Sequence, residues 1–308
     1  MALRRPLVTI AGVVQELPLA DTLPDGPFLD LTDTAPATPP AGTVRMFRRE
    51  LAGSQMPAFI DPSGLEMSLQ PGIARNKIGV WQPGGNSTAV PGLFGMMALT
   101  PLGTAANRGW ASTDAFTRMK RLGYVSAATA AAFSGIRLGA SQISTGTGAG
   151  LGGFFIVQRF AITDAVIVTD ARTFAGISNS SAAPTNVEPS TLLNCIGVGH
   201  GAADANMKIF YGGSAAQTPI DLGAGFPKSL NIPYELILVA SPRVANTINW
   251  QVTRLDTGAT VAGSVTGAAA VIPQSSMGMT PFQIWRCNNA TLAAAALDII
   301  SLYVGTDN

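Results

Sequence analysis

Hydrophobic and polar residues alternate strictly over residues 248–253, where Ile248, Trp250 and Val252 are separated by polar side chains. Side chains of a β-strand point to opposite faces with a period of two, so this pattern predicts a strand with one buried face. A turn at residues 256–258, ending in Gly258, and the apolar Val261 and Val265 predict the returning strand of a hairpin. The apolar run 235–240 before it predicts a fully buried neighbouring strand.

Short apolar segments of the same kind recur through the second half of the chain. Turn residues separate them, which is typical of an antiparallel β-sandwich or jelly roll. The segments are 154–160, 173–178, 195–198, 207–211, 234–240, 248–255, 259–265, 284–287 and 297–304. Residues 292–297, LAAAAL, also fit a helical turn, and this alternative stays open.

In the N-terminal third, the apolar segments that predict strands are shorter. Apolar residues on both sides of Ala11-Gly12 predict a small hairpin, which is marginally stable alone and needs a partner. The Pro- and Thr-rich stretch 34–43 predicts a semi-rigid extended linker. Residues 44–111 predict short strands and loops, with a turn at residues 61–64.

Residues 112–134 predict the one helical region. Ser112 or Thr113 is a suitable N-cap, Phe116, Met119 and Leu122 recur at helical spacing, and Gly123 suits a C-terminal stop. The alanine run that follows predicts a second short helix over residues 126–133. The pair lacks the basic face of a DNA-reading helix-turn-helix.

A glycine-rich stretch ends in Gly148-x-Gly150-x-x-Gly153. The dinucleotide fingerprint requires a helix after these glycines, whereas residues 154–157 predict a strand, so the match is rejected. A flexible domain boundary is the interpretation, with an N-terminal segment and linker at 1–40, a mixed central domain at 41–150 and a C-terminal β-sandwich at 151–308.

Charged residues make up only 12% of the 308 residues, about half the usual share. Because no apolar run approaches the roughly 20 residues of a spanning helix, membrane insertion is not expected and burial between subunits is favoured. A net charge of +1 gives no general reason to bind nucleic acid. The basic start lacks a cleavage pattern, so export is not expected.

The sequence gives little indication of a catalytic site or a metal site. The single histidine, His200, has no nucleophile motif beside it, and no spacing singles out a carboxylate pair among Asp164, Asp170, Glu188, Asp204 and Asp221. We therefore expect no enzyme activity, metal or cofactor. Cys195 and Cys287 are expected to be buried free thiols, with a disulfide between them left open.

Binding of a saccharide is easier to support, because it needs an aromatic face together with amide or carboxylate groups. Residues of suitable type in the β-rich half are Tyr211, Asp221, Trp285, Asn288 and His200.

The segment PLVTIAGVVQELPLADTL at residues 6–23 resembles the N-terminal segment of tailed-bacteriophage fibre proteins. RFAITDAVIVTDARTFAGIS, KIFYGGSAAQTPIDLGAGFP, YELILVASP and LDIISLYVGTD resemble a recurring tail-fibre or capsid-fibre domain. The resemblance covers the start of the chain and roughly residues 74–308. It implies a virion structural protein assembled in the host bacterial cytoplasm, and it brings no catalytic residues.

The expected protein is thus a homotrimeric fibre whose N-terminal piece attaches to other virion proteins and whose outer β-domain binds the host surface, with a glycan as the expected ligand. The attachment residues are Leu7, Val8, Thr9, Ile10, Val13, Val14 and Leu17. The alternatives are a capsid decoration or baseplate component without receptor binding, and a glycan-degrading tailspike. Fold alone does not choose among them.

Overall fold

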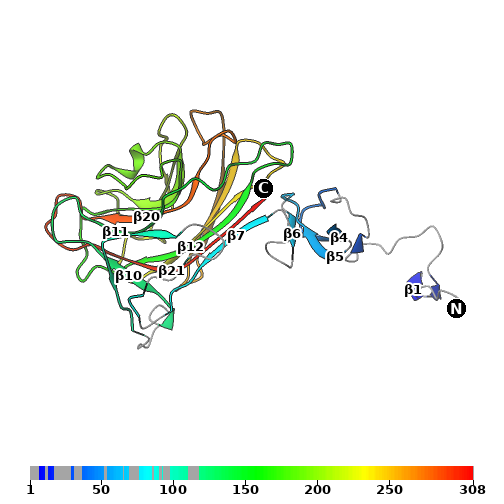
Figure 1. Ribbon diagram of the computed structural model, residues 1–308, viewed down its shortest axis with the longest axis horizontal. Coiled ribbons are helices and arrows are strands. Elements are labelled where there is room, and N and C mark those ends of the chain that lie inside the picture. Colours follow the sequence, from blue (N-terminus) through cyan, green and yellow to red (C-terminus); the bar gives the residue numbers. More distant parts are fainter. Residues whose placement is uncertain are drawn as a thin grey trace.

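The protein is built almost entirely from antiparallel β-sheets, as the computed structural model in Figure 1 shows. The structure describes residues 37–51, 54–64, 66–68, 76–84, 87–89, 92, 98–109 and 118–307, and the strand residues 7–10, 13–16 and 29–30. Among these, no helix is long and apolar enough to cross a membrane.

The N-terminal part holds two small sheets. Strands β1 (Leu7–Ile10) and β2 (Val13–Glu16) pair as the expected hairpin, and Figure 1 shows β1 at the end of the molecule opposite the large body. A four-stranded sheet follows, in which only β3 pairs in parallel with its neighbour. Its strands are β3 (Leu29–Asp30), β4 (Arg45–Leu51), β5 (Ser54–Ile60) and β6 (Glu66–Ser68).

The large body is a sandwich of two sheets. The first sheet has the order β19-β18-β17-β12-β21-β10-β9, and β7 also pairs with β21. Its strands are β7 (Asn76–Trp81), β9 (Thr104–Ala106), β10 (Leu122–Val125), β12 (Phe154–Ile162), β17 (Pro233–Ala240), β18 (Thr247–Arg254), β19 (Thr260–Thr266) and β21 (Ala296–Asp307).

The second sheet has the order β16-β15-β14-β13-β20-β11-β8. Its strands are β8 (Leu99–Leu102), β11 (Phe133–Leu138), β13 (Arg172–Ser178), β14 (Cys195–His200), β15 (Lys208–Gly212), β16 (Ile220–Asp221) and β20 (Thr280–Cys287). A 3-10 turn, Pro189–Thr191, lies in the segment between β13 and β14.

One apolar core fills the space between the two sheets. Alternate residues of β12, β17, β18 and β21 face alternate residues of β13, β14 and β20, as the period of two requires. The predicted hairpin at 248–265 is confirmed: Ile248, Trp250 and Val252 are buried, and Gly258 has a φ of 75° in the turn. The predicted full burial of residues 235–240 is not found, because β17 alternates and its outward residues are only half-buried.

The predicted helical pair is not confirmed. Residues 112–117 of the first helix lie outside the described residues, whereas Leu122 and Gly123 lie in β10 and pair with Ile299 and Asp298. Residues 126–132 of the second form a turn. Pairing with the core strand β21 outweighs the helical preference of the alanines. The helical turn left open for residues 292–297 is not found either, because residues 292–295 form a loop and residues 296–297 begin β21.

The predicted boundary at residue 150 is also corrected. Strands β7 to β11 belong to the same two sheets as the strands after residue 150, so the sandwich begins well before it. The glycine-rich stretch is a tight loop between β11 and β12, where Gly148 and Gly150 have φ values of 83° and 86° and donate backbone hydrogen bonds to the carbonyl of Pro242. These positions need glycine because other residues rarely adopt positive φ.

Candidate functional site

A second, smaller apolar cluster lies on the outer face of the second sheet. Trp285 of β20 points outward, since its neighbours Phe282 and Ile284 belong to the core between the sheets. The segment 179–194 covers this face: the side-chain amide of Gln283 donates to the carbonyls of Ser180 at 2.8 Å and Ala182 at 3.4 Å. This cover explains why every residue of β20 is buried.

The cover leaves a hollow of about 190 Å³ above the indole. An aromatic floor and a rim of small, hydroxyl and amide side chains line it. The lining residues are Phe174, Ser178, Ser180, Ala182, Ala183, Pro184, Thr185, Leu192, Gln283 and Trp285. An aromatic ring, hydroxyl groups and an amide thus meet in this hollow.

Neighbouring rings fix the position of the indole. Phe133 meets Trp285 edge-on with ring centres 5.7 Å apart, and Phe174 lies 6.0 Å away. Gly197 lies beneath Phe174, where a Cβ would come within 2.7 Å of the Phe174 ring. The floor of the hollow is therefore held in one arrangement by packing.

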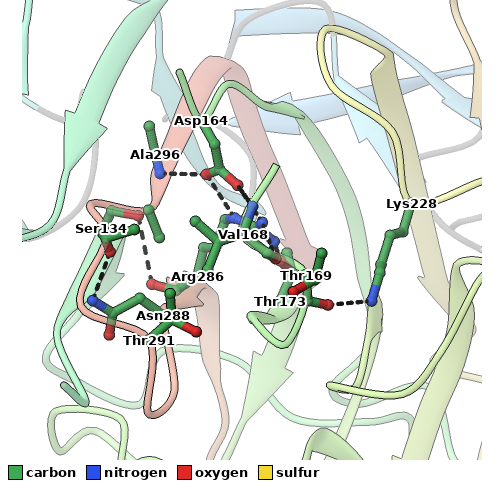
Figure 2. Close-up of polar contacts among 12 residues, drawn as sticks. Ser134, Asp164, Val168, Thr169, Thr173, Lys228, Arg286, Asn288, Thr291 and Ala296 are labelled. Atoms are coloured by element: carbon green, nitrogen blue, oxygen red, sulfur yellow. Dashed lines mark hydrogen bonds and ion pairs between the residues drawn. The ribbon is translucent and has the colours of Figure 1, made fainter. Parts of the chain in front are cut away.

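Beside Trp285 in sequence, Arg286 points the opposite way, into the end of the sandwich. Figure 2 shows it facing Asp164. Its guanidinium donates to Oδ1 and Oδ2 of Asp164 at 2.9 and 2.5 Å, and to Thr173 Oγ1 at 2.9 Å. The carboxylate also accepts the backbone N–H groups of Val168 and Ala296. We call Asp164, Thr173, His200 and Arg286 the interior network; all four are at most 5% exposed.

His200 completes the interior network as a neutral hydrogen-bond acceptor. Its Nδ1 lies 3.0 Å from the carbonyl of Gly201, which only accepts, so Nδ1 carries the proton. Nε2 then accepts from Arg286 Nη1 at 2.9 Å. Burial and the Arg286 charge lower the pKa of His200 to about 3. The only histidine therefore supports the fold and does not face a ligand.

The structure disperses the other predicted binding residues. Asn288 is fully buried and holds loops together through the backbone of Ala127, Thr129, Ala132 and Ala293. Tyr211 packs against the main core. Asp221 is exposed, but its carboxylate accepts from Asn206 and from the backbone of Gly223. Of the five, Trp285 alone lines the hollow.

Gln283 and the rim residues of segment 178–185 were missed by the sequence reasoning. Gln283 had a usable signal, since it stands two residues before Trp285 and therefore shares its face of the strand. The rim had none, because nothing local indicates that the segment between β13 and β14 folds back over β20.

The five carboxylates considered for catalysis are each engaged with the protein. Besides Asp164 and Asp221, Glu188 pairs with Arg172 at 2.8 Å and Asp204 with Lys208 at 2.6 Å, while Asp170 accepts from Thr291. Among the described residues, no three His, Cys, Asp or Glu side chains group as a metal site.

Cys195 and Cys287 are buried free thiols, as expected. They lie on β14 and β20, which flank β13, and they pair with its opposite ends, at Ser178 and Arg172. That is two strand spacings and roughly 20 Å along the strand, which excludes a disulfide in this fold. Burial raises the pKa of Cys195 to about 12 and also raises that of Cys287.

The attachment residues predicted between Leu7 and Leu17 fall on or beside β1 and β2, of which only the backbone pairing is described; Leu17 lies outside the described residues. Their role in attachment stays a prediction.

No family model matches the sequence, and no curated protein does. Solved structures do resemble the fold. A protein of unknown function from Shewanella oneidensis MR-1 is 14% identical with a TM-score of 0.45, covering 75% of this chain and 86% of that one. Peanut lectin is 11% identical with a TM-score of 0.48, covering 75% and 97%. An endo-β-1,4-glucuronan lyase from the fungus Trichoderma reesei is 12% identical with a TM-score of 0.41, covering 74% and 94%. At these identities the likeness concerns the fold alone.

Proposed function

We propose that this protein is a non-catalytic bacteriophage virion component, a homotrimeric fibre whose sandwich binds a host-surface saccharide in the hollow above Trp285. The hollow is the observation that carries the proposal. The N-terminal hairpin attaches the chain to the particle, in line with the fibre-like sequence at residues 6–23.

The chemistry of the hollow suits a sugar ring. An indole offers a broad apolar surface to the C–H face of a sugar, and the rim offers hydroxyl and amide groups for sugar hydroxyls. A volume of about 190 Å³ suits one sugar unit, so the terminal residue of a surface polysaccharide is the expected ligand.

Filling the hollow tests the saccharide site. Ala183 is exposed on its rim, and Ala183→Trp should block entry without disturbing the core. Ala128→Trp, on an exposed loop elsewhere in the sandwich, is the matched control. The full-length chain is titrated with purified host polysaccharide by calorimetry. Loss of binding in Ala183→Trp alone supports the site, and equal binding by both variants contradicts it.

Assembly is tested separately. Light scattering on the purified chain should give the mass of three copies, because a sequence with so few charges is expected to bury surface between subunits. Ile10→Asp with Val13→Asp should keep the chain off the particle while saccharide binding persists. Incorporation of the double variant at the normal level would contradict attachment through the hairpin.

A purely structural role, as capsid decoration or baseplate component, is favoured by one observation. The outer face of the first sheet carries half-buried apolar side chains, among them Phe155 and Tyr303, whose rings lie 5.9 Å apart. Such a face suits contact with another protein. Particles without this chain would then lose integrity and not merely attachment, which electron microscopy and infection assays distinguish. Release of reducing ends from the polysaccharide would instead indicate a degrading tailspike.

A further inference from the structure

Along one edge, the central strand β21 pairs with two different strands in succession. Residues Ala296 to Ile299 pair with β10, and residues Leu302 to Asp307 pair with β7. Ile300 and Ser301 lie between the two pairings. On the other side of β21 the register with β12 shifts at the same level, because Arg159 pairs with Ser301 and Phe160 with Ile299. Ile300 is the extra residue of a β-bulge.

A pocket of about 550 Å³ opens over this interruption. Ile300 and Ser301 line it from β21, Gln82 from the residue after β7, and residues 118–120 from the segment that leads to β10. The chain leaves the sheet on both sides of the gap, which is why a cavity forms here and not over the continuous part of the sheet. It is separate from the hollow above Trp285, which lies on the other sheet.

Three basic side chains line the pocket. They are Arg118, Lys120 and Arg159, and Arg159 pairs with Glu235 at 2.6 Å. Lys120 is exposed and makes no ion pair with a described residue. Met119, Leu255 and Ile300 supply apolar wall.

A neighbouring ion cluster holds the segment that carries Lys120. Asp298 of β21 is fully buried on the outer face and accepts from Arg108 at 2.8 Å, from Arg121 at 2.9 Å and from Thr163 at 2.7 Å. We call these four residues the outer-face network. Through its bond to Asp298, Arg121 fixes the position of Lys120 next to it in the chain.

We propose that this pocket is a second ligand site, which binds an acidic saccharide through a carboxylate or phosphate group. Lys120 and Arg159 bind the anionic group, Ser301 offers a hydroxyl, and the apolar wall contacts the sugar ring. Charge-assisted hydrogen bonds of this kind are the strong polar contacts of binding sites, and the volume suits a disaccharide. The site does not depend on the function proposed for the Trp285 hollow.

The test uses the full-length chain and three probes: a glucuronate-containing disaccharide, glucose 6-phosphate and neutral cellobiose. Calorimetry and saturation-transfer NMR report binding. We expect an acidic probe to bind at least about tenfold more tightly than cellobiose, and affinity to fall as salt is raised from 0.05 to 0.5 M, as screening requires. Preference for the carboxylate or for the phosphate probe identifies the natural source of the anion. Absence of binding by both acidic probes, or equal binding of cellobiose, overturns the proposal.

Variants place the binding in this pocket. Lys120→Gln should weaken the acidic probe about tenfold, the size expected for losing one charged hydrogen bond. Ser301→Glu places a carboxylate against Arg159 and should abolish binding. Lys208→Gln is the control, because it removes the same charge from β15 of the other sheet. Unfolding curves confirm that each variant folds. Unchanged affinity in Ser301→Glu, or equal loss in Lys208→Gln, overturns the assignment; loss of binding in Ala183→Trp does not bear on it.

Discussion

Two buried aspartates of the sandwich differ in what surrounds them. Asp164 lies between the sheets in the interior network, where its partner Arg286 has no exposed surface. Asp298 lies on the outer face of the first sheet, where the side chain of Arg108 is 24% exposed and that of Arg121 is 9% exposed. The first pair joins the two sheets at their end, and the second holds chain segments against one sheet. A partner that reaches water can be rehydrated when its carboxylate is lost, so the two sites should respond differently to the same change.

Loss of the Asp164 charge should have the largest effect. Asp164→Asn leaves Arg286 as a buried cation without a counter-charge and should lower the free energy of unfolding by about 3–5 kcal/mol. Denaturant titration followed by circular dichroism measures it. The double variant Asp164→Asn with Arg286→Met should recover part of the loss. If Asp164→Asn alone lowered the free energy of unfolding by less than about 1 kcal/mol, Arg286 would be accessible to water, in contradiction to its burial.

The matching change on the outer face, Asp298→Asn, should cost less, about 1–3 kcal/mol, because Arg108 can turn to solvent. It should also loosen the segment before β10 and weaken acidic-saccharide binding in the pocket beside it. Hydrogen exchange at residues 118–125 measures the loosening. A cost equal to that of Asp164→Asn would remove the distinction between the two networks.

The interior network also predicts a pH dependence through its histidine. The pKa of His200 is lowered to about 3 in the folded protein, whereas an unfolded histidine titrates near 6.5. Between about pH 3 and pH 6.5, His200 is protonated in the unfolded chain and neutral in the folded chain. Stability from this group is therefore complete above about pH 6.5 and is lost as the pH falls toward 3, by about 1 kcal/mol per unit.

His200→Gln isolates this dependence, because glutamine cannot take up the proton. The variant should lose less stability than the parent chain when denaturant titrations at pH 7 and pH 5 are compared, whatever its stability at pH 7. Parallel curves for the two proteins would contradict the neutral, buried assignment of His200.

Salt should produce the smallest difference. Raising ionic strength from 0.1 to 1 M screens the partly exposed Arg108–Asp298 pair and should reduce the cost of Asp298→Asn by a few tenths of a kcal/mol, leaving Asp164→Asn unchanged. Two denaturant series at each salt concentration measure it. A larger salt effect on Asp164→Asn would reverse the ranking.

Elements with a local signature were predictable from the sequence. The alternation around Trp250 located a strand, its buried face and its hairpin partner, and the N-terminal hairpin was located in the same way. The predicted helical pair is not confirmed, because the conformation of residues 122–125 is set by pairing with β21, more than 170 residues further on. The interior network could not be predicted from the sequence either, because Arg286 and Asp164 are 122 residues apart in the chain. Trp285 was predicted as a binding residue and lines the hollow, but the enclosure of the hollow depends on a distant segment, and the binding role stays a prediction.

The central positions of β20 and β21 have a consequence for synthesis. Each lies inside its sheet, so the second sheet consists of two separate parts until β20 is complete at residue 287, and the first sheet stays divided until β21 is complete at residue 307. Until then, the edges of the earlier strands that later pair with β20 and β21 have unpaired backbone groups, which can pair with a neighbouring chain. The N-terminal hairpin and the four-stranded sheet contain no strand beyond residue 68, so they can form before the sandwich strands are synthesised. In the proposed trimer, neighbouring nascent chains would therefore be able to associate through their N-terminal sheets before β20 and β21 are synthesised.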